Sequence, residues 1–186
     1  MLEVSFVRRR GQRDRVYVHR DDGTELDWAF PTYGDNLPHD LCHLVVEDGL
    51  GLTDGFWGLV DQGVVVGLVN NEATLMKDGI PLVDHPEADF TGLVEAERAV
   101  AVLGSPTVEV ESVPDGVLAI ARVPGDRAAA PPTGDAHERA ARLGFVLPAS
   151  ATPDVVAAIQ ARQRDLVAPW RSLADGGAIT LTFTRR

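Results

Sequence analysis

Two histidines in the segment 37–47 (LPHDLCHLVVE) are the residues best suited to chemistry. His39 and His43 are four residues apart, and on a helix residues at this spacing project from the same face. Both imidazoles could then reach one ion. Two neutral imidazoles suit Zn²⁺, or iron and manganese when carboxylates complete the set of ligands. The spacing therefore predicts that His39 and His43 are metal ligands, most simply for zinc.

A third protein ligand is expected from outside this pair. Glu47 continues the same helix face, but it is eight residues after His39, which is about 12 Å along a straight helix. A side chain at that distance would strain to close on the same ion. The nearest candidates elsewhere in the sequence are Asp54, Glu72 and His85.

Two carboxylates beside the histidines, Asp40 and Glu47, are the predicted catalytic residues. In a metal-dependent enzyme, most simply a hydrolase or a lyase-like catalyst, water bound to the ion becomes the base or nucleophile. A neighbouring carboxylate then completes or orients the site. Asp40 could instead be a metal ligand, a partner of an imidazole, or an acid that stabilises the positive end of the helix. The segment lacks the glutamate of the HExxH motif, which acts as a general base.

The histidines also suit a purely structural role. Three aliphatic residues form the expected core side of the helix: Leu41, Leu44 and Val45. His43 lies close to that side and could be a buried neutral histidine with one hydrogen bond, while His39 would be solvated in the first turn. This alternative predicts a non-catalytic module that binds a protein or a small ligand.

The segment 39–43 (HDLCH) resembles the His-Asp-x-x-His motif of the zinc-associated family that assists ubiquinone biosynthesis. That resemblance implies zinc binding and an all-helical fold. The family places a glutamate twelve residues after its second histidine, where this chain has Gly55, one position after Asp54. The pair His39 and Asp40 is also similar to that of the HD phosphohydrolases, which implies a divalent metal.

A longer resemblance covers about the first third of the chain. The stretch PHDLCHLVVE, followed by GFWG at 55–58, resembles a family of small uncharacterised actinobacterial proteins. This resemblance implies a bacterial protein and no particular activity.

Strand patterns cluster at the two ends of the chain. Apolar and polar residues alternate with a period of two, which is typical of half-buried strands, and the expected strands are 2–6, 15–20, 26–30 and 179–183. An Asp-Asp-Gly turn signal at 21–23 separates the second strand from the third. A lone hairpin is marginal in water, so we expect one small antiparallel sheet in which the last strand returns to the N-terminal three.

Helical patterns fill the rest of the chain. Helices are expected from Pro38 to about residue 50, from Thr53 or Asp54, over 89–103 and over 152–173, and Pro169 should kink or break the last one. The segment 64–69 suits either a helix or a strand, 108–113 a short strand, and 128–134 a loop. The whole chain, 1–186, is therefore predicted to be a single α+β domain: a small antiparallel sheet packed by several helices.

Composition predicts an acidic, soluble, cytoplasmic protein. Against 28 Asp and Glu there are 17 Lys and Arg, a net charge of −11, which argues against nucleic acid or an anionic membrane as the main partner. The N-terminus lacks an apolar run before a cleavage site, and no apolar stretch is long enough to cross a bilayer. A single cysteine, Cys42, excludes an intramolecular disulfide. No phosphate-binding glycine motif is present, so no organic cofactor is implied, and the partner is an unidentified small molecule or protein.

Three successive arginines, Arg8, Arg9 and Arg10, form a second cluster. If the first and last strands are neighbours, these side chains could meet Arg185 and Arg186 in a basic corner that holds a phosphate or an acidic surface. The alternative is a charged rim that protects a sheet edge from aggregation.

Overall fold

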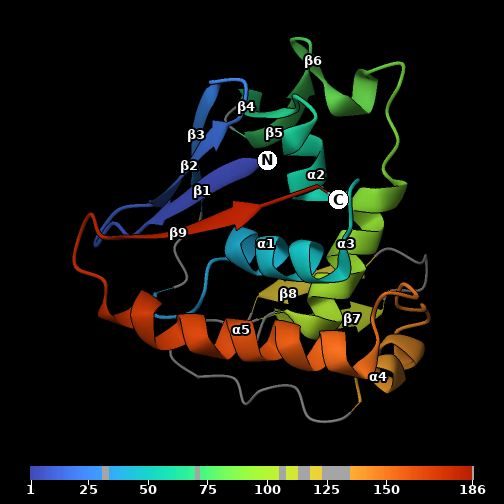
Figure 1. Cartoon of the computed structure of the whole chain (residues 1–186). Coiled ribbons are helices and arrows are strands. Elements are labelled where there is room, and N and C mark those ends of the chain that lie inside the picture. Colours follow the sequence, from blue (N-terminus) through green and yellow to red (C-terminus); the bar gives the residue numbers. More distant parts are fainter. Residues whose placement is uncertain (31–33, 70–71, 105–107, 113–117, 123–134, 186) are drawn as a thin grey trace.

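The N-terminal sheet joins the two ends of the chain. The computed structural model describes residues 1–30, 34–69, 72–104, 108–112, 118–122 and 135–185. Four antiparallel strands in the order β3-β2-β1-β9 form this sheet: β1 (Leu2–Val7), β2 (Asp14–Arg20), β3 (Glu25–Phe30) and β9 (Ala178–Phe183). Figure 1 shows β9 beside β1. The predicted antiparallel sheet with a returning C-terminal strand is confirmed.

The alternation of residues along β1 decides which face of the sheet is buried. Leu2, Val4 and Phe6 are completely buried, because they project from one face of the strand. On the opposite face Ser5 pairs with Thr180, and their hydroxyl oxygens are 2.7 Å apart. The buried face of the sheet therefore covers the helical layer that contains the two histidines.

The described part of the chain contains five α-helices: α1 (His39–Leu50), α2 (Phe56–Asp61), α3 (Thr91–Leu103), α4 (Ala136–Arg142) and α5 (Pro153–Ser172). The predicted α+β class is confirmed. Thr152 caps α5 by accepting a hydrogen bond from the backbone N–H of Val155, as its position before a proline predicts. Helix α5 continues through Pro169, so the expected break is not observed. A proline so near the C-terminal end removes only one N–H donor from the helix.

Helix α1 is the central helix of the molecule. It lies between the N-terminal sheet and α5, and α3 packs against another of its sides (Figure 1). Gly49 allows α5 to come close, since a Cβ at this position would be 2.4 Å from Cγ1 of Ile159. Buried residues lie all around α1, which is typical of a helix enclosed by a core. His43 and Glu47 are therefore buried although they are polar.

Two smaller antiparallel units complete the described structure. The segment 64–69, which suited a helix or a strand, contains strand β4 (Val65–Val69), which pairs with β5 (Glu72–Lys77) and through it with β6 (Ile80–Pro81). A 3₁₀ helix, η1 (Leu82–Asp84), follows β6. The strand expected over 108–113 is β7 (Val108–Ser112), paired with β8 (Leu118–Arg122). The loop expected over 128–134 lies outside the described residues. No helix within the described ranges has the length and apolar character needed to span a membrane.

The described arginines do not form the expected basic corner. Strand β9 runs antiparallel to β1, and its last residue, Phe183, pairs with Leu2. Arg185 therefore lies near the start of β1, whereas Arg8 lies just beyond its end. Arg185 is 4.0 Å from Asp61, measured from Nε to Oδ2. Arg8 is buried, and its guanidinium donates to the carbonyls of Trp170 and Arg171 at the end of α5. Arg186 lies outside the described residues.

Candidate metal centre

Helices α1 and α3 bring three potential ligands to one point. His39 is the first residue of α1 and His43 lies one turn later, whereas Glu97 projects from the middle of α3. The Nε2 atoms of the two histidines are 3.1 Å apart. Oε2 of Glu97 lies 3.4 Å from Nε2 of His43 and 3.6 Å from Nε2 of His39. These three residues form the one group in the described part of the chain with the geometry to hold a metal ion.

The size of this triangle matches a metal centre. Zinc binds nitrogen and carboxylate oxygen at about 2.0–2.2 Å in a tetrahedral arrangement, which places neighbouring ligand atoms about 3.3–3.6 Å apart. The three separations of 3.1, 3.4 and 3.6 Å lie around this value. One ion could therefore contact all three atoms after shifts of a few tenths of an ångström.

Glu47 supports His43 from the other side of the imidazole. Its side chain is fully buried, and Oε1 lies 3.0 Å from Nδ1 of His43. Oε1 also accepts the backbone N–H of Phe56, and Oε2 accepts the backbone N–H of Trp57, at 3.1 and 2.9 Å. Gly55 makes this approach possible, because a Cβ there would be 2.6 Å from Cδ of Glu47. The N-terminal end of α2 therefore holds the carboxylate in one position.

These hydrogen bonds orient the imidazole of His43. Both oxygens of Glu47 accept backbone N–H groups, so we assign the carboxylate as the acceptor and Nδ1 of His43 as the donor. In the neutral imidazole this leaves the lone pair of Nε2 directed at His39 and Glu97. A carboxylate that accepts the N–H of a metal-binding histidine is a recurrent outer partner in metal sites.

The electrostatics of the cluster favour a cation. Burial lowers the pKa of the His43 imidazole, but its contacts with Glu47 and Glu97 outweigh burial and raise that pKa to about 10. Burial raises the pKa of the Glu97 carboxyl, but the contacts of Glu97 with His39 and His43 outweigh burial and hold that pKa well below its usual range. Two carboxylates around a buried imidazole thus require a positive charge between them, which either a proton or a metal ion can supply.

Two polar atoms of the cluster lack hydrogen-bond partners among the described residues. They are Oε2 of Glu97 and Nδ1 of His39, and both are buried. Buried polar atoms are usually paired, so an orphaned oxygen that faces two imidazole nitrogens is consistent with a place for a cation. The His39 and Glu97 side chains are 23% and 36% exposed, against 3% for His43. An ion would therefore enter from the side of His39 and Glu97.

The other residues singled out in the sequence lie elsewhere. Oδ2 of Asp40 accepts the indole N–H of Trp28 at 3.0 Å and does not contact an imidazole. Asp54 faces Gln62, with 3.4 Å between Oδ1 and Nε2. His85 lies 3.6 Å from Asp78, and the side chain of Glu72 lies outside the described residues. Glu97, from another element, is the residue that the structure brings to the histidine pair as a candidate third ligand. The catalytic roles of Asp40 and Glu47 stay predictions.

Comparison of the chain with family models, with curated proteins and with solved structures found no match. The resemblances drawn from the segments around the histidines stay predictions. The assignment of function therefore rests on the geometry of His39, His43 and Glu97.

Proposed function

We propose that this protein binds a divalent, zinc-like metal ion through His39, His43 and Glu97 and uses it in hydrolytic chemistry. The observation that carries the proposal is the triangle of two Nε2 atoms and one carboxylate oxygen, whose edges are 3.1, 3.4 and 3.6 Å. Two imidazoles and one carboxylate form a common ligand set of catalytic zinc.

A catalytic site is favoured over a structural one by the number and exposure of the ligands. Structural zinc sites have four protein ligands, whereas catalytic sites have three and leave a position for water or substrate. Three candidate ligands meet here in the described part of the chain, and two of them are partly exposed. When bound, such an ion lowers the pKa of a coordinated water toward neutrality.

Within this proposal Glu47 is a positioning residue. Its oxygens are occupied by two backbone N–H groups and by Nδ1 of His43, so it holds the imidazole and keeps Nε2 available to the metal. Phe56 closes the same side, with its ring centroid 6.2 Å from that of His43.

A structural role for the histidines is the second candidate. Protonated His43 between Glu47 and Glu97 is a satisfied buried ion pair without any metal, and its raised pKa of about 10 favours this state. The protein would then be a non-catalytic module that binds a protein or a small ligand.

Metal content distinguishes the two candidates. Protein purified without a histidine tag and equilibrated with Zn²⁺ should hold about one equivalent after gel filtration, measured by mass spectrometry of the metal. His39→Ala and Glu97→Gln should each lose it and remain folded, because both side chains are partly exposed. His85→Ala is the matched control and should keep the ion. Folded wild-type protein without zinc, or equal binding by all the variants, would support the structural role.

Activity is then tested with the zinc-loaded protein. Hydrolysis of 4-nitrophenyl acetate and of bis(4-nitrophenyl) phosphate should depend on zinc and be lost in Glu97→Gln. Stoichiometric zinc without turnover of any activated ester would leave a metal-binding protein and overturn the hydrolytic part of the proposal.

A further inference from the structure

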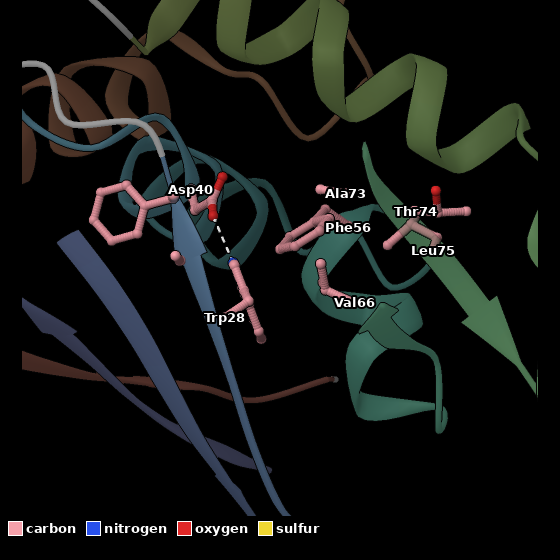
Figure 2. Close-up of a pocket in the computed structure, with 9 residues that line it drawn as sticks. Trp28, Asp40, Phe56, Val66, Ala73, Thr74 and Leu75 are labelled. Carbon is pink, nitrogen blue, oxygen red and sulfur yellow. Dashed lines mark hydrogen bonds between the residues drawn. The ribbon is translucent and has the colours of Figure 1, made fainter. Parts of the chain in front are cut away.

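A pocket of about 210 Å³ lies beside the metal centre, where β3, α1, α2 and the β4–β5 hairpin meet. Figure 2 shows Trp28 and Asp40 on one side of it and Phe56, Val66 and Leu75 on the other. Most of its lining is aromatic or aliphatic. Concave, mostly apolar sites with a few polar groups are typical of small-molecule binding.

The aromatic side of the pocket is held in place by its neighbours. The rings of Trp28 and Phe56 are 6.0 Å apart and nearly perpendicular, an arrangement that aromatic pairs prefer. Trp57 packs against both rings, and the backbone N–H of Phe56 is bonded to Glu47. A ligand would therefore meet a preformed surface.

Asp40 is the one charged side chain in the described lining. Its Oδ2 accepts the indole N–H of Trp28, and the indole N–H of Trp57 donates to its backbone oxygen at 2.9 Å. These two hydrogen bonds hold both the side chain and the backbone of Asp40 in place. No described residue donates to Oδ1, so one carboxylate oxygen is available at the edge of an apolar pocket.

The volume limits the size of the ligand. An apolar cavity of about 150 Å³ holds one benzene molecule, and drug-sized ligands occupy about 300–1,000 Å³. The 210 Å³ measured here suits a single ring with a short side chain. Charge limits the chemical class of the ligand, because an anion would be repelled by Asp40 and would find no cation among the described lining residues. The net charge of the protein, −11, also disfavours an anion.

We propose that this pocket binds a small primary amine, with an apolar ring resting against the preformed surface of Trp28 and Phe56 and the ammonium group bonded to Oδ1 of Asp40. The site is separate from the metal ligands and shares only the wall formed by Phe56, which contacts His43. The inference therefore goes beyond the proposed metal function and does not depend on it.

Three isosteric probes test the inference: 2-phenylethylamine, 2-phenylethanol and phenylacetate, titrated by calorimetry or by ligand-observed NMR. The amine should bind about tenfold or more tightly than the alcohol, since a hydrogen bond to a charged group exceeds a neutral one, and phenylacetate should not bind. Equal binding of amine and phenylacetate, or no binding of any probe at millimolar concentration, would overturn the proposal.

Two variants locate the binding. Asp40→Asn keeps an acceptor for Trp28 but removes the charge, so it should weaken amine binding about tenfold and leave the alcohol unchanged; Asp54→Asn is the matched control. Ala73→Trp, at an exposed lining position, should fill the pocket and abolish binding of both. Unchanged amine affinity in Asp40→Asn would place the amine elsewhere. Amine binding should survive in His39→Ala, so a failed metal site and a failed amine site give different results.

Discussion

Two regions of the molecule bury charge, and they do so in different ways. Arg20 donates from Nε and Nη2 to the carbonyls of Val60 and Val64 at 2.9 and 2.7 Å. In the metal centre, Oε2 of Glu97 and Nδ1 of His39 are buried without a hydrogen bond within the described residues. The arginine therefore stabilises the fold, since its guanidinium donates to buried backbone carbonyls that need donor partners. The cluster on α1 and α3 instead directs two imidazole nitrogens and one carboxylate oxygen at one point, as a candidate ion site requires.

Among the substitutions that test this difference, removal of Glu47 should lower stability the most. Glu47→Ala leaves two backbone N–H groups and Nδ1 of His43 without their acceptor in the core, so the free energy of unfolding should fall by about 3–5 kcal/mol. Chemical denaturation monitored by circular dichroism measures this loss. Glu47→Gln retains one acceptor oxygen and should lose less stability, while its zinc affinity falls about 10–100-fold. A Glu47→Ala protein as stable as the wild type would contradict the assigned network.

Gly55 tests the same network through the backbone. In Gly55→Ala the new Cβ would lie 2.6 Å from Cδ and Oε2 of Glu47 and 2.9 Å from Cβ of Ala96. Overpacking of this kind costs about 1–3 kcal/mol, and the displaced carboxylate should also weaken zinc binding. Gly63→Ala is a poor control because its φ is +99°, whereas Ala88→Gly alters a half-buried loop residue that is not part of the cluster. Stability lost without any change in zinc affinity would separate Glu47 from the metal centre.

A substitution of Arg20 tests whether the two regions are independent of each other. Arg20→Met removes the donors to Val60 and Val64; the Val60 carbonyl keeps its bond from the Gly63 N–H, but the Val64 carbonyl loses the arginine donor. This loss should lower the free energy of unfolding by about 1–3 kcal/mol. Zinc affinity should stay within about twofold of the wild-type value. A large change in zinc affinity would show that the two regions are not independent.

The last prediction concerns how zinc affinity changes with pH. The pKa of His43 is raised from 6.5 to about 10 without metal, so below that pH the folded protein holds a proton that the metal must displace. Affinity should therefore increase with pH, about tenfold per unit between pH 7 and 9. Competition with a chromophoric chelator measures it. A flat profile over this window would mean that no proton leaves His43.

Local patterns explain what sequence analysis could predict. The period of two in β1 and β9 and the four-residue spacing of His39 and His43 are properties of neighbouring residues, and the structure contains both. The sequence predicts Arg8 in a surface cluster and gives no reason to single out Arg20. Both are buried, because burial of an arginine depends on carbonyls that distant segments supply. No pattern within a single strand contains that information.

The spacing of residues could not predict Glu97 as the third member of the candidate metal site. It lies 54 residues after His43, and only the packing of α3 on α1 brings the two together. The sequence predicts a helix over 89–103 but does not show which of its sides meets α1. The buried residues of α3 are Ala96, Ala99, Val100, Val102 and Leu103.

The pairing of β9 with β1 has a consequence for how the chain folds during synthesis. Ser5 and its partner Thr180 are 175 residues apart, so the hydrogen-bonding edge of β1 stays open until nearly all of the described chain has left the ribosome. Contacts of such long range slow folding and leave unpaired strand edges exposed to other nascent chains. Chaperone dependence should therefore be governed by the arrival of β9, and a nascent chain truncated before Ala178 should aggregate through β1.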